Sequence, residues 1–334
     1  MAVLGAAATP VDARPPERIC LAAHPLGVSR VEVVDTTGGP RFGRQFQGEG
    51  SSFLAPGEVV LTFDDGPFSV STGPILDTLD RYCAKATFFA VGRMAIVQPE
   101  TLREVARRGH TIAGHTWAHA NVARLAESRR AAEVEKGFSA LTEVLGGPVA
   151  PFFRFPYLDA PASELERLAQ RNIATFGIDV DSTDSHGQKV SPKRIVDRTL
   201  AGLEKVGKGI ILLHDLKDST AAALPELLDA LSTKGYRLVH LVPKAKFEPN
   251  AAFSAEVAAV IAKRNAKLAA KQAKATAQVE ITGSIKPPRN LRSAKAGAER
   301  TSASANKKPS RKGRKKRDRR GKSQEVSNGP FRPI

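Results

Sequence analysis

The chain has few cysteines and no long apolar run. Its 334 residues include two cysteines, Cys20 and Cys83, and their spacing is not that of a cysteine zinc site. In an exported protein the pair would form a disulfide between the N-terminal segment and the first helix, and in a reducing compartment both would stay buried free thiols. No run approaches the roughly 20 apolar residues that a membrane span needs, so no transmembrane segment is predicted.

Acidic residues are scarce in the C-terminal part of the chain. Residues 251–334 hold 22 Lys and Arg but 5 Asp and Glu, whereas residues 1–250 hold 29 of each kind. The basic character therefore belongs to the tail and says nothing about an active site. We predict a basic, helix-prone segment over 251–278 and a disordered tail over 279–334. The tail would either contact an anionic polymer or membrane surface or be solvated, and no specific nucleic-acid binding is expected.

The N-terminus lacks the basic region of a complete signal peptide. Residues 1–17 have a short apolar run and small residues, so we interpret them as the remnant of a secretory signal or as a disordered N-terminus. A periplasmic or secreted location is expected, with a cytoplasmic one as the alternative. Residues 18–56, which contain a β-rich VEVVD stretch and a turn, are predicted to form a short β extension on the edge or bottom of the domain that follows.

A regular alternation of strands and helices begins near residue 57 and defines a domain over 57–247. The expected strands cover 59–63, 86–92, 111–115, 152–156, 174–180, 209–215 and 236–242, and the expected helices cover 72–83, 99–108, 126–145, 161–172, 191–206 and 220–234. Pro99, the Ser191-Pro192 pair and Gly146 and Gly207 mark helix ends. About seven apolar strands alternating with helices predict an α/β fold, a parallel barrel with its helices outside.

Polar residues gather where these expected strands end. The set comprises Asp64, Asp65, His115, Arg154, Asp179, Asp181 and His214. Because the carboxyl ends of barrel strands converge on one mouth, residues far apart in sequence would share one site there.

The two histidines of GHTWAHANV have the spacing of metal ligands. His115 and His119 are four residues apart, so on one helical turn both imidazoles could meet one ion. A carboxylate from a neighbouring strand end, Asp64 or Asp65, would complete three protein ligands and leave room for water and substrate. The set suits zinc, and cobalt, nickel or iron could occupy the same ligands.

Four motifs in this order carry a family resemblance. TFDDGP at 62–67, HTWAH at 115–119, RFPY at 154–157 and LLH at 212–214 resemble the NodB-homology polysaccharide deacetylases, carbohydrate esterase family 4. The likeness covers about residues 55–245 and leaves out the basic tail. It implies a deformed (β/α) barrel, of the glycoside hydrolase/deacetylase type, and metal-dependent removal of acetyl groups from N-acetylated amino sugars.

The resemblance also implies a role for each motif residue. Asp64 would be the general base, held by Arg154, and the metal ligands would be Asp65, His115 and His119. The backbone N–H of Tyr157 would stabilise the oxyanion, and Pro156 and Leu212 would belong to the acetyl pocket. His214 would be the general acid, with Asp184 orienting it.

The chemistry of amide hydrolysis fits these roles independently. It needs a polarised carbonyl and a deprotonated water, and one divalent metal supplies both. One of the adjacent carboxylates would then bind the metal and the other would accept the proton of the water. A histidine is suited to protonate the amine leaving group near neutral pH.

One motif departs from the family pattern. Asp184 matches the expected Asp in DVDSTDS, but Ser185 stands where the family has a Trp. The missing indole puts substrate preference, and with it the rate, in doubt, though not metal binding.

The sequence leaves three functions open. The first is an N-deacetylase of an amino-sugar saccharide such as chitin oligosaccharide, peptidoglycan or poly-N-acetylglucosamine. The second keeps the site but hydrolyses another amide, such as a formylated amino sugar or a cyclic imide. The third is a saccharide-binding module without catalysis, against which the intact set of base, acid and metal ligands argues. A monomer is expected.

Overall fold

A computed structural model describes residues 26–48, 51–186 and 190–283, with side chains as far as residue 276. The N-terminal remnant, Cys20 and the tail from residue 284 lie outside the described residues. Cys83 is disulfide-bonded, and the partner predicted from the sequence is Cys20. Over the described residues, no helix is long and apolar enough to cross a membrane.

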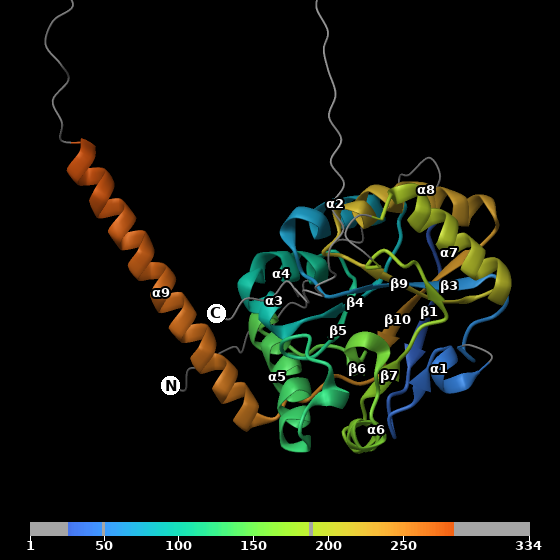
Figure 1. Cartoon of the computed structure of the whole chain (residues 1–334), viewed down its shortest axis with the longest axis horizontal. Helices are drawn as coiled ribbons and strands as arrows, with labels where there is room; N and C mark the ends of the chain where they lie inside the picture. The colour runs from blue at the N-terminus through green and yellow to red at the C-terminus, as the bar shows by residue number, and fades with distance from the viewer. Residues whose placement is uncertain (1–25, 49–50, 187–189, 284–334) are drawn as a thin grey trace, which may run out of the picture. The chain divides into compact units, whose positions relative to one another are not determined.

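The described chain forms a parallel sheet wrapped by helices (Figure 1). The strands are β1 (Val28–Val34), β2 (Arg41–Phe42), β3 (Glu58–Asp64), β4 (Thr87–Ala90), β5 (Thr111–Gly114), β6 (Phe152–Phe153), β7 (Ala174–Phe176), β8 (Val180–Asp181), β9 (Gly209–His214) and β10 (Arg237–Pro243). The helices are α1 (Arg44–Gln47), α2 (Ser69–Arg81), α3 (Gly92–Val97), α4 (Pro99–Arg107), α5 (Glu127–Leu145), α6 (Ala162–Gln170), α7 (Pro192–Val206), α8 (Asp218–Thr233) and α9 (Ala251–Gly283). The predicted α/β class and deformed parallel barrel are confirmed.

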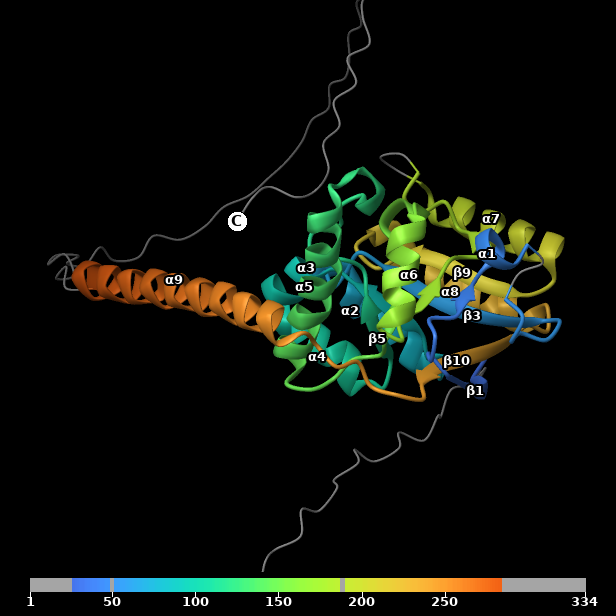
Figure 2. The ribbon, with the colours of Figure 1, turned by 90° about the horizontal axis from the view of Figure 1, so that it is seen from below.

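β3 is the central strand, and all seven of its residues are buried. It pairs with β9 over its length, with β10 at its start and with β4 at its end, always in parallel. The strand path runs β1-β10-β3-β4-β5-β6-β7-β2, and β8 joins through β9. The N-terminal segment thus supplies a strand at each end of this path, and both views place β1 beside β10 (Figures 1 and 2).

Helix ends follow the local signals in the sequence. Pro99 is the first residue of α4, and the Ser191 side chain accepts the N–H of Arg194 to cap α7. Gly146 and Gly207 end α5 and α7 in the left-handed conformation that glycine adopts most easily.

Three strand predictions were too long. The predicted strand 86–92 ends at Ala90 because the chain turns into the short, unpredicted helix α3 at Gly92. The predicted strand 152–156 keeps only Phe152 and Phe153, and a 3₁₀ turn over Pro156–Leu158 follows it. The predicted strand 174–180 divides into β7 and β8 around Gly177.

α9 runs five residues past the predicted end of the helix-prone segment. The sequence has neither Gly nor Pro between Ala251 and Thr282, so nothing stops the helix before Gly283. Its first turns belong to the compact unit that holds the sheet, where Val257 is buried and Ser254 contacts Ser139. Residues 266–276 of the second unit are exposed.

Alternation along each strand decides which side chains face the barrel interior. Residues 59, 61 and 63 of β3 pack in the large core against the helices, while Val60 belongs to the smaller core inside the barrel. The same alternation places Phe89, Ala113, Phe152 and Ile210 inside. Because side chains alternate along a strand, the inner row ends at residues 64, 115, 154 and 214. The strands therefore aim four of the predicted site residues into one mouth.

Candidate active site

Asp64 and Arg154 form a buried ion pair at the mouth of the barrel. The Nη1 atom of Arg154 donates to Oδ1 of Asp64 at 2.7 Å, and the two side chains are 0% and 4% exposed. Arg154 also donates to Thr62 and to the carbonyls of Phe176 and Gly177. Burial lowers the pKa of the guanidinium, and the facing Asp64 carboxylate counters this shift. Arg154 is thus fixed in place, and Oδ2 of Asp64 is the oxygen turned away from it.

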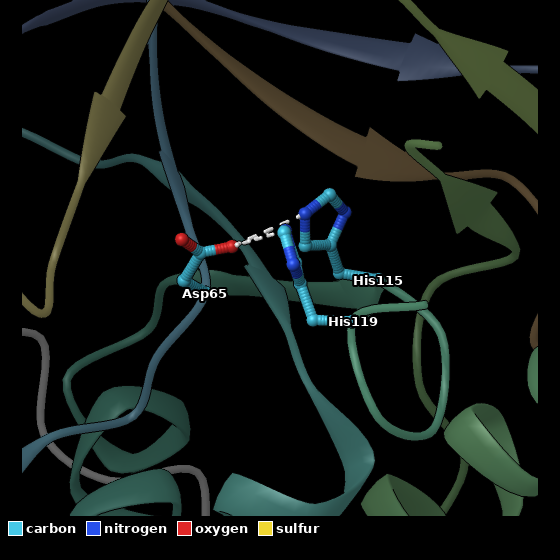
Figure 3. A group of neighbouring side chains, drawn as sticks. All are labelled: Asp65, His115 and His119. Atoms are coloured by element: carbon cyan, nitrogen blue, oxygen red, sulfur yellow. Dashed lines mark ion pairs between the residues drawn. The ribbon is translucent and has the colours of Figure 1, made fainter. Parts of the chain in front are cut away.

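Asp65, His115 and His119 form a compact cluster of metal-type ligands (Figure 3). Oδ1 of Asp65 lies 3.3 Å from Nε2 of His115 and 3.0 Å from Nε2 of His119. Figure 3 shows both rings turned toward this one oxygen. Burial alone would raise the pKa of Asp65, but the two imidazoles hold it well below its usual value.

The cluster fits a divalent cation. Oδ1 of Asp65 is buried without a hydrogen bond of good geometry, although two imidazole nitrogens lie close to it. Nδ1 of His115 is 2.8 Å from the carbonyl oxygen of Arg154, which can only accept, so Nδ1 is the donor there and Nε2 is the nitrogen that faces the cluster. Three converging ligand atoms, one fixed by an outer hydrogen bond, are what a three-residue zinc site provides.

The loop that carries the two histidines is held from outside. The backbone N–H of Ala118 donates to Glu133 on α5, and the carbonyls of Thr116 and Trp117 accept from Gly92 and Arg93 on α3. A Cβ on Gly137 would approach the backbone of Thr116 to 2.7 Å, so only glycine lets α5 pack this closely.

His214 and Asp184 form a second buried pair at the mouth. Nδ1 of His214 lies 2.6 Å from Oδ1 of Asp184, whose Oδ2 accepts from the His214 backbone and the Thr220 hydroxyl. Burial lowers the pKa of His214, but the neighbouring carboxylates, Asp184 first and then Asp65 and Asp64, together raise it to about 9. Burial alone would raise the pKa of Asp184, and the bond to His214 keeps it below its usual value. With Nδ1 occupied, Nε2 of His214 is the nitrogen left for substrate.

The third motif brings a strained turn to the mouth. Tyr157 has φ 61° and its side chain is 68% exposed, next to the ring of His119 at 5.0 Å between centroids. Pro156 and Leu212 are buried. Left-handed backbone is uncommon outside glycine, and around the site Asp65, Thr116, His119, Tyr157, Leu158 and Thr183 all adopt it. Such clustering is typical of functional sites.

Two expected members of the mouth behave differently. Asp179 was expected at a strand end, but it precedes β8 and accepts hydrogen bonds from Ser51 and the N–H of Ile210, near the start of β9. That expectation was wrong because the strand breaks at Gly177. Asp181 does end β8, where it accepts the N–H of Thr183. Ser185, in place of the family's Trp, is exposed.

Sequence reasoning missed one buried carboxyl group. Asp215 follows His214 directly, is 1% exposed and accepts from Thr72 and the N–H of Gly66. Burial raises the pKa of its carboxyl to about 7. The sequence signal that could have identified Asp215 is its position directly after the buried strand Gly209–His214.

Comparison of the chain with known proteins identifies its family. The model of the polysaccharide deacetylase family matches residues 54–176. The chitooligosaccharide deacetylase of Bradyrhizobium sp. (strain ANU 289) is 30% identical over 200 residues, covering 56% of this chain and 89% of the relative. The chain therefore belongs to the polysaccharide deacetylase family, the NodB-homology group that its motifs resemble.

Two further relatives are peptidoglycan enzymes by name. The peptidoglycan-N-acetylmuramic acid deacetylase PdaC of Bacillus subtilis is 31% identical over 182 residues, which are 54% of this chain and 37% of that protein. The solved structure of a peptidoglycan deacetylase of Bdellovibrio bacteriovorus is 33% identical with a TM-score of 0.60, covering 67% of this chain and 61% of that one. This chain thus spans 37% of PdaC and 61% of the solved chain, less than two thirds of each.

Proposed function

We propose that the protein is a metal-dependent hydrolase that removes N-acetyl groups from an amino-sugar polymer of the peptidoglycan or chitin type. The convergence of Asp65, His115 and His119 beside the Asp64–Arg154 pair carries this proposal. The substrate class is inferred from the named relatives. The need for a metal is inferred from the three converging ligand atoms. Zinc suits two imidazoles and one carboxylate, and cobalt or nickel accepts the same set.

Asp64 is the base in this proposal. A divalent cation bound by the three ligands supplies polarisation of the amide carbonyl and a more acidic water. Arg154 occupies Oδ1 of Asp64, so Oδ2 takes the proton of the attacking water. The adjacent carboxylates thereby have different tasks: Asp65 binds the cation, and Asp64 accepts the proton.

The turn after β6 stabilises charge on the former carbonyl oxygen. Tyr157, whose ring lies beside that of His119, would offer its backbone N–H as a fixed donor to the developing negative charge. The buried Pro156 and Leu212 provide an apolar pocket for the acetyl methyl group.

His214 protonates the amine leaving group. Asp184 holds Nδ1, which orients Nε2 toward the substrate and keeps the imidazole protonated. Asp184 is therefore a positioning residue for the acid. Exposed Ser185 leaves the space beside this pair without an indole, and we expect a wider tolerance for the sugar bound there.

A raised pKa for His214 is directly measurable. In metal-free protein we expect His214 to titrate at about 9, and Asp184→Asn to bring its pKa down toward the ordinary value of 6.5. Because the folded pKa lies above the unfolded one, the pair stabilises the fold fully below about pH 6.5 and loses this effect as pH rises through about 9. With a cation held by Asp65, His115 and His119, the pKa of His214 would be lower than in the metal-free protein, because like charges repel.

NMR titration of the imidazole, assigned with His214→Gln, measures this value. The alkaline limb of kcat/KM should move to lower pH in Asp184→Asn as well. An imidazole pKa near 6.5 in the wild-type protein, or one unmoved by Asp184→Asn, would contradict the assignment.

The other parts of the chain support this function in our proposal. Residues 57–247 are the catalytic domain and 18–56 its N-terminal β extension. The predicted segments 251–278 and 279–334 form a basic extension, of which the first turns, up to residue 265, belong to the compact unit. Action on an envelope polymer implies a periplasmic or secreted location. The excess of Lys and Arg, with Lys267, Lys271 and Lys274 exposed, suits contact with an anionic polymer or membrane surface. Co-sedimentation of the full chain with peptidoglycan sacculi should then weaken as salt rises.

Acetate release tests the proposed function. Purified protein is incubated with N-acetylglucosamine oligomers and with peptidoglycan, after chelation and again after zinc is restored. We expect acetate only with metal. Bound zinc without acetate from any of these substrates would favour another amide, and unchanged saccharide binding after chelation would favour a module without catalysis.

A further inference from the structure

Asp215 is a buried carboxyl group to which the proposed chemistry gives no task. It follows the inward-facing His214, so alternation along the chain turns it to the outer side of the sheet, toward the start of α2. Among the described residues, the groups that donate to its carboxylate are neutral, and no Lys or Arg forms an ion pair with it. A carboxylate without a cationic neighbour is costly to bury, so Asp215 depends on its hydrogen bonds to neighbouring segments.

Asp215 connects three elements through both side chain and backbone. The N–H of Gly66 donates to Oδ1 at 2.9 Å, and the Thr72 hydroxyl donates to Oδ2 at 2.7 Å. The Asp215 carbonyl accepts from the Ser71 hydroxyl at 2.6 Å, and its N–H donates to the carbonyl of Asp64 at 3.3 Å. The end of β3, the start of α2 and the end of β9 are therefore joined at one residue.

The turn after β3 is shaped around this carboxylate. A Cβ on Gly66 would lie 2.0 Å from Oδ2 of Asp215, so the carboxylate occupies the space that a side chain at 66 would need. Asp65, one residue earlier, has φ 79°. Its N–H donates to Phe89, and the Gly66 carbonyl accepts from Val91, so hydrogen bonds on both sides hold this left-handed residue.

We propose that Asp215 is a positioning residue for the metal centre: its carboxylate fixes the turn Asp64–Gly66, so that Asp65 meets His115 and His119. The same residue is bonded to the base-bearing strand and adjacent to His214, so it also sets the spacing between base and acid. This inference rests on the proposed function for the roles of these residues, but its test reads zinc affinity without any substrate.

Zinc affinity of folded variants tests the proposal. The dissociation constant is measured by competition with a chromophoric chelator, well below the melting temperature of each variant. Asp215→Ala removes both acceptors, and we expect zinc affinity to fall about 10–100-fold, the usual effect of losing an outer contact at a metal site. Asp215→Asn keeps an amide oxygen for Gly66, so its loss should be less than about 10-fold. In acetate release, kcat should fall more than KM changes.

Glu58→Gln is the matched control. Glu58 is also a buried carboxylate on the β3 ladder, 5% exposed, but it lies at the opposite end of the strand and pairs with Arg30. Its loss should lower the melting temperature and leave zinc affinity unchanged. A purely structural role for Asp215 predicts the same result for Asp215→Ala.

Each outcome decides the proposal. Wild-type zinc affinity in folded Asp215→Ala overturns it. Should that variant fail to fold, Thr72→Val removes one donor to the same carboxylate, and an unchanged zinc affinity there overturns it too. If wild-type protein binds zinc but releases no acetate, the proposed function fails while the zinc comparison still decides the role of Asp215.

Discussion

Asp64→Asn should reduce kcat for acetate release by about 100- to 10,000-fold, the usual contribution of a general base. The amide keeps an oxygen that can accept from Arg154 at the present distance of 2.7 Å, so this hydrogen bond can persist although the counter-charge of the guanidinium is lost. Zinc affinity should change little, because Asp64 lies outside the ligand cluster. Acetate release and zinc titration on the same preparation measure both quantities.

The neighbouring substitution should give the opposite result. Asp65→Asn removes a carboxylate ligand, so zinc affinity should fall by more than the roughly 10–100-fold that an outer contact costs. Added zinc should then restore part of the activity, whereas it should restore none in Asp64→Asn. If both variants lose zinc equally, the division of tasks between these carboxylates is wrong.

Arg154→Met should destabilise the fold by about 3–5 kcal/mol, as expected when one partner of a buried ion pair is removed. Three features make this position unusually sensitive. The Asp64 carboxylate would be left buried without its partner, two backbone carbonyls would lose their donor, and the guanidinium stacked 4.2 Å from the ring centroid of Phe89 would be lost. Urea unfolding of the full chain measures the change.

A double substitution separates charge from packing. Asp64→Asn combined with Arg154→Met removes both charges, so it should be less destabilised than the sum of the single changes by about 0.5–3 kcal/mol. Arg30→Met is the control, because Arg30 pairs with Glu58 at the other end of β3 but is 34% exposed. Equal losses for Arg30→Met and Arg154→Met would show that burial of the pair is not the cause.

Much of the site could be predicted because the geometry of parallel strands is simple. His115, Arg154 and His214 each end the inner row of a strand, so the order of apolar runs sufficed to bring them together. For the metal trio, the residues alone indicated His115 and His119 with either Asp64 or Asp65, and the family resemblance selected Asp65. The two histidines meet on a loop rather than on the helical turn from which their spacing was argued.

The remainder depended on contacts between segments far apart in the chain. The break at Gly177 has no local signal strong enough to end a strand, yet it moved Asp179 from the mouth to the start of β8. In the sequence Asp215 looks like a polar residue that simply ends a strand. Its contacts become visible only in the structure, where α2 packs beside it. Sequence patterns indicate which residues of one segment are buried. The break at Gly177 and the position of Asp215 instead depend on how two segments pack against each other.

The pairing of β3 also determines the order in which the parts of the site become available as the chain is synthesised. Strand β3 needs β9, about 150 residues later, to complete its ladder, whereas the metal ligands all lie within residues 65–119. A chain emerging from the ribosome would thus present its metal ligands well before His214 appears. Contacts so distant in sequence form slowly, and until they do the fully apolar stretch Val59–Leu61 stays open to other partners.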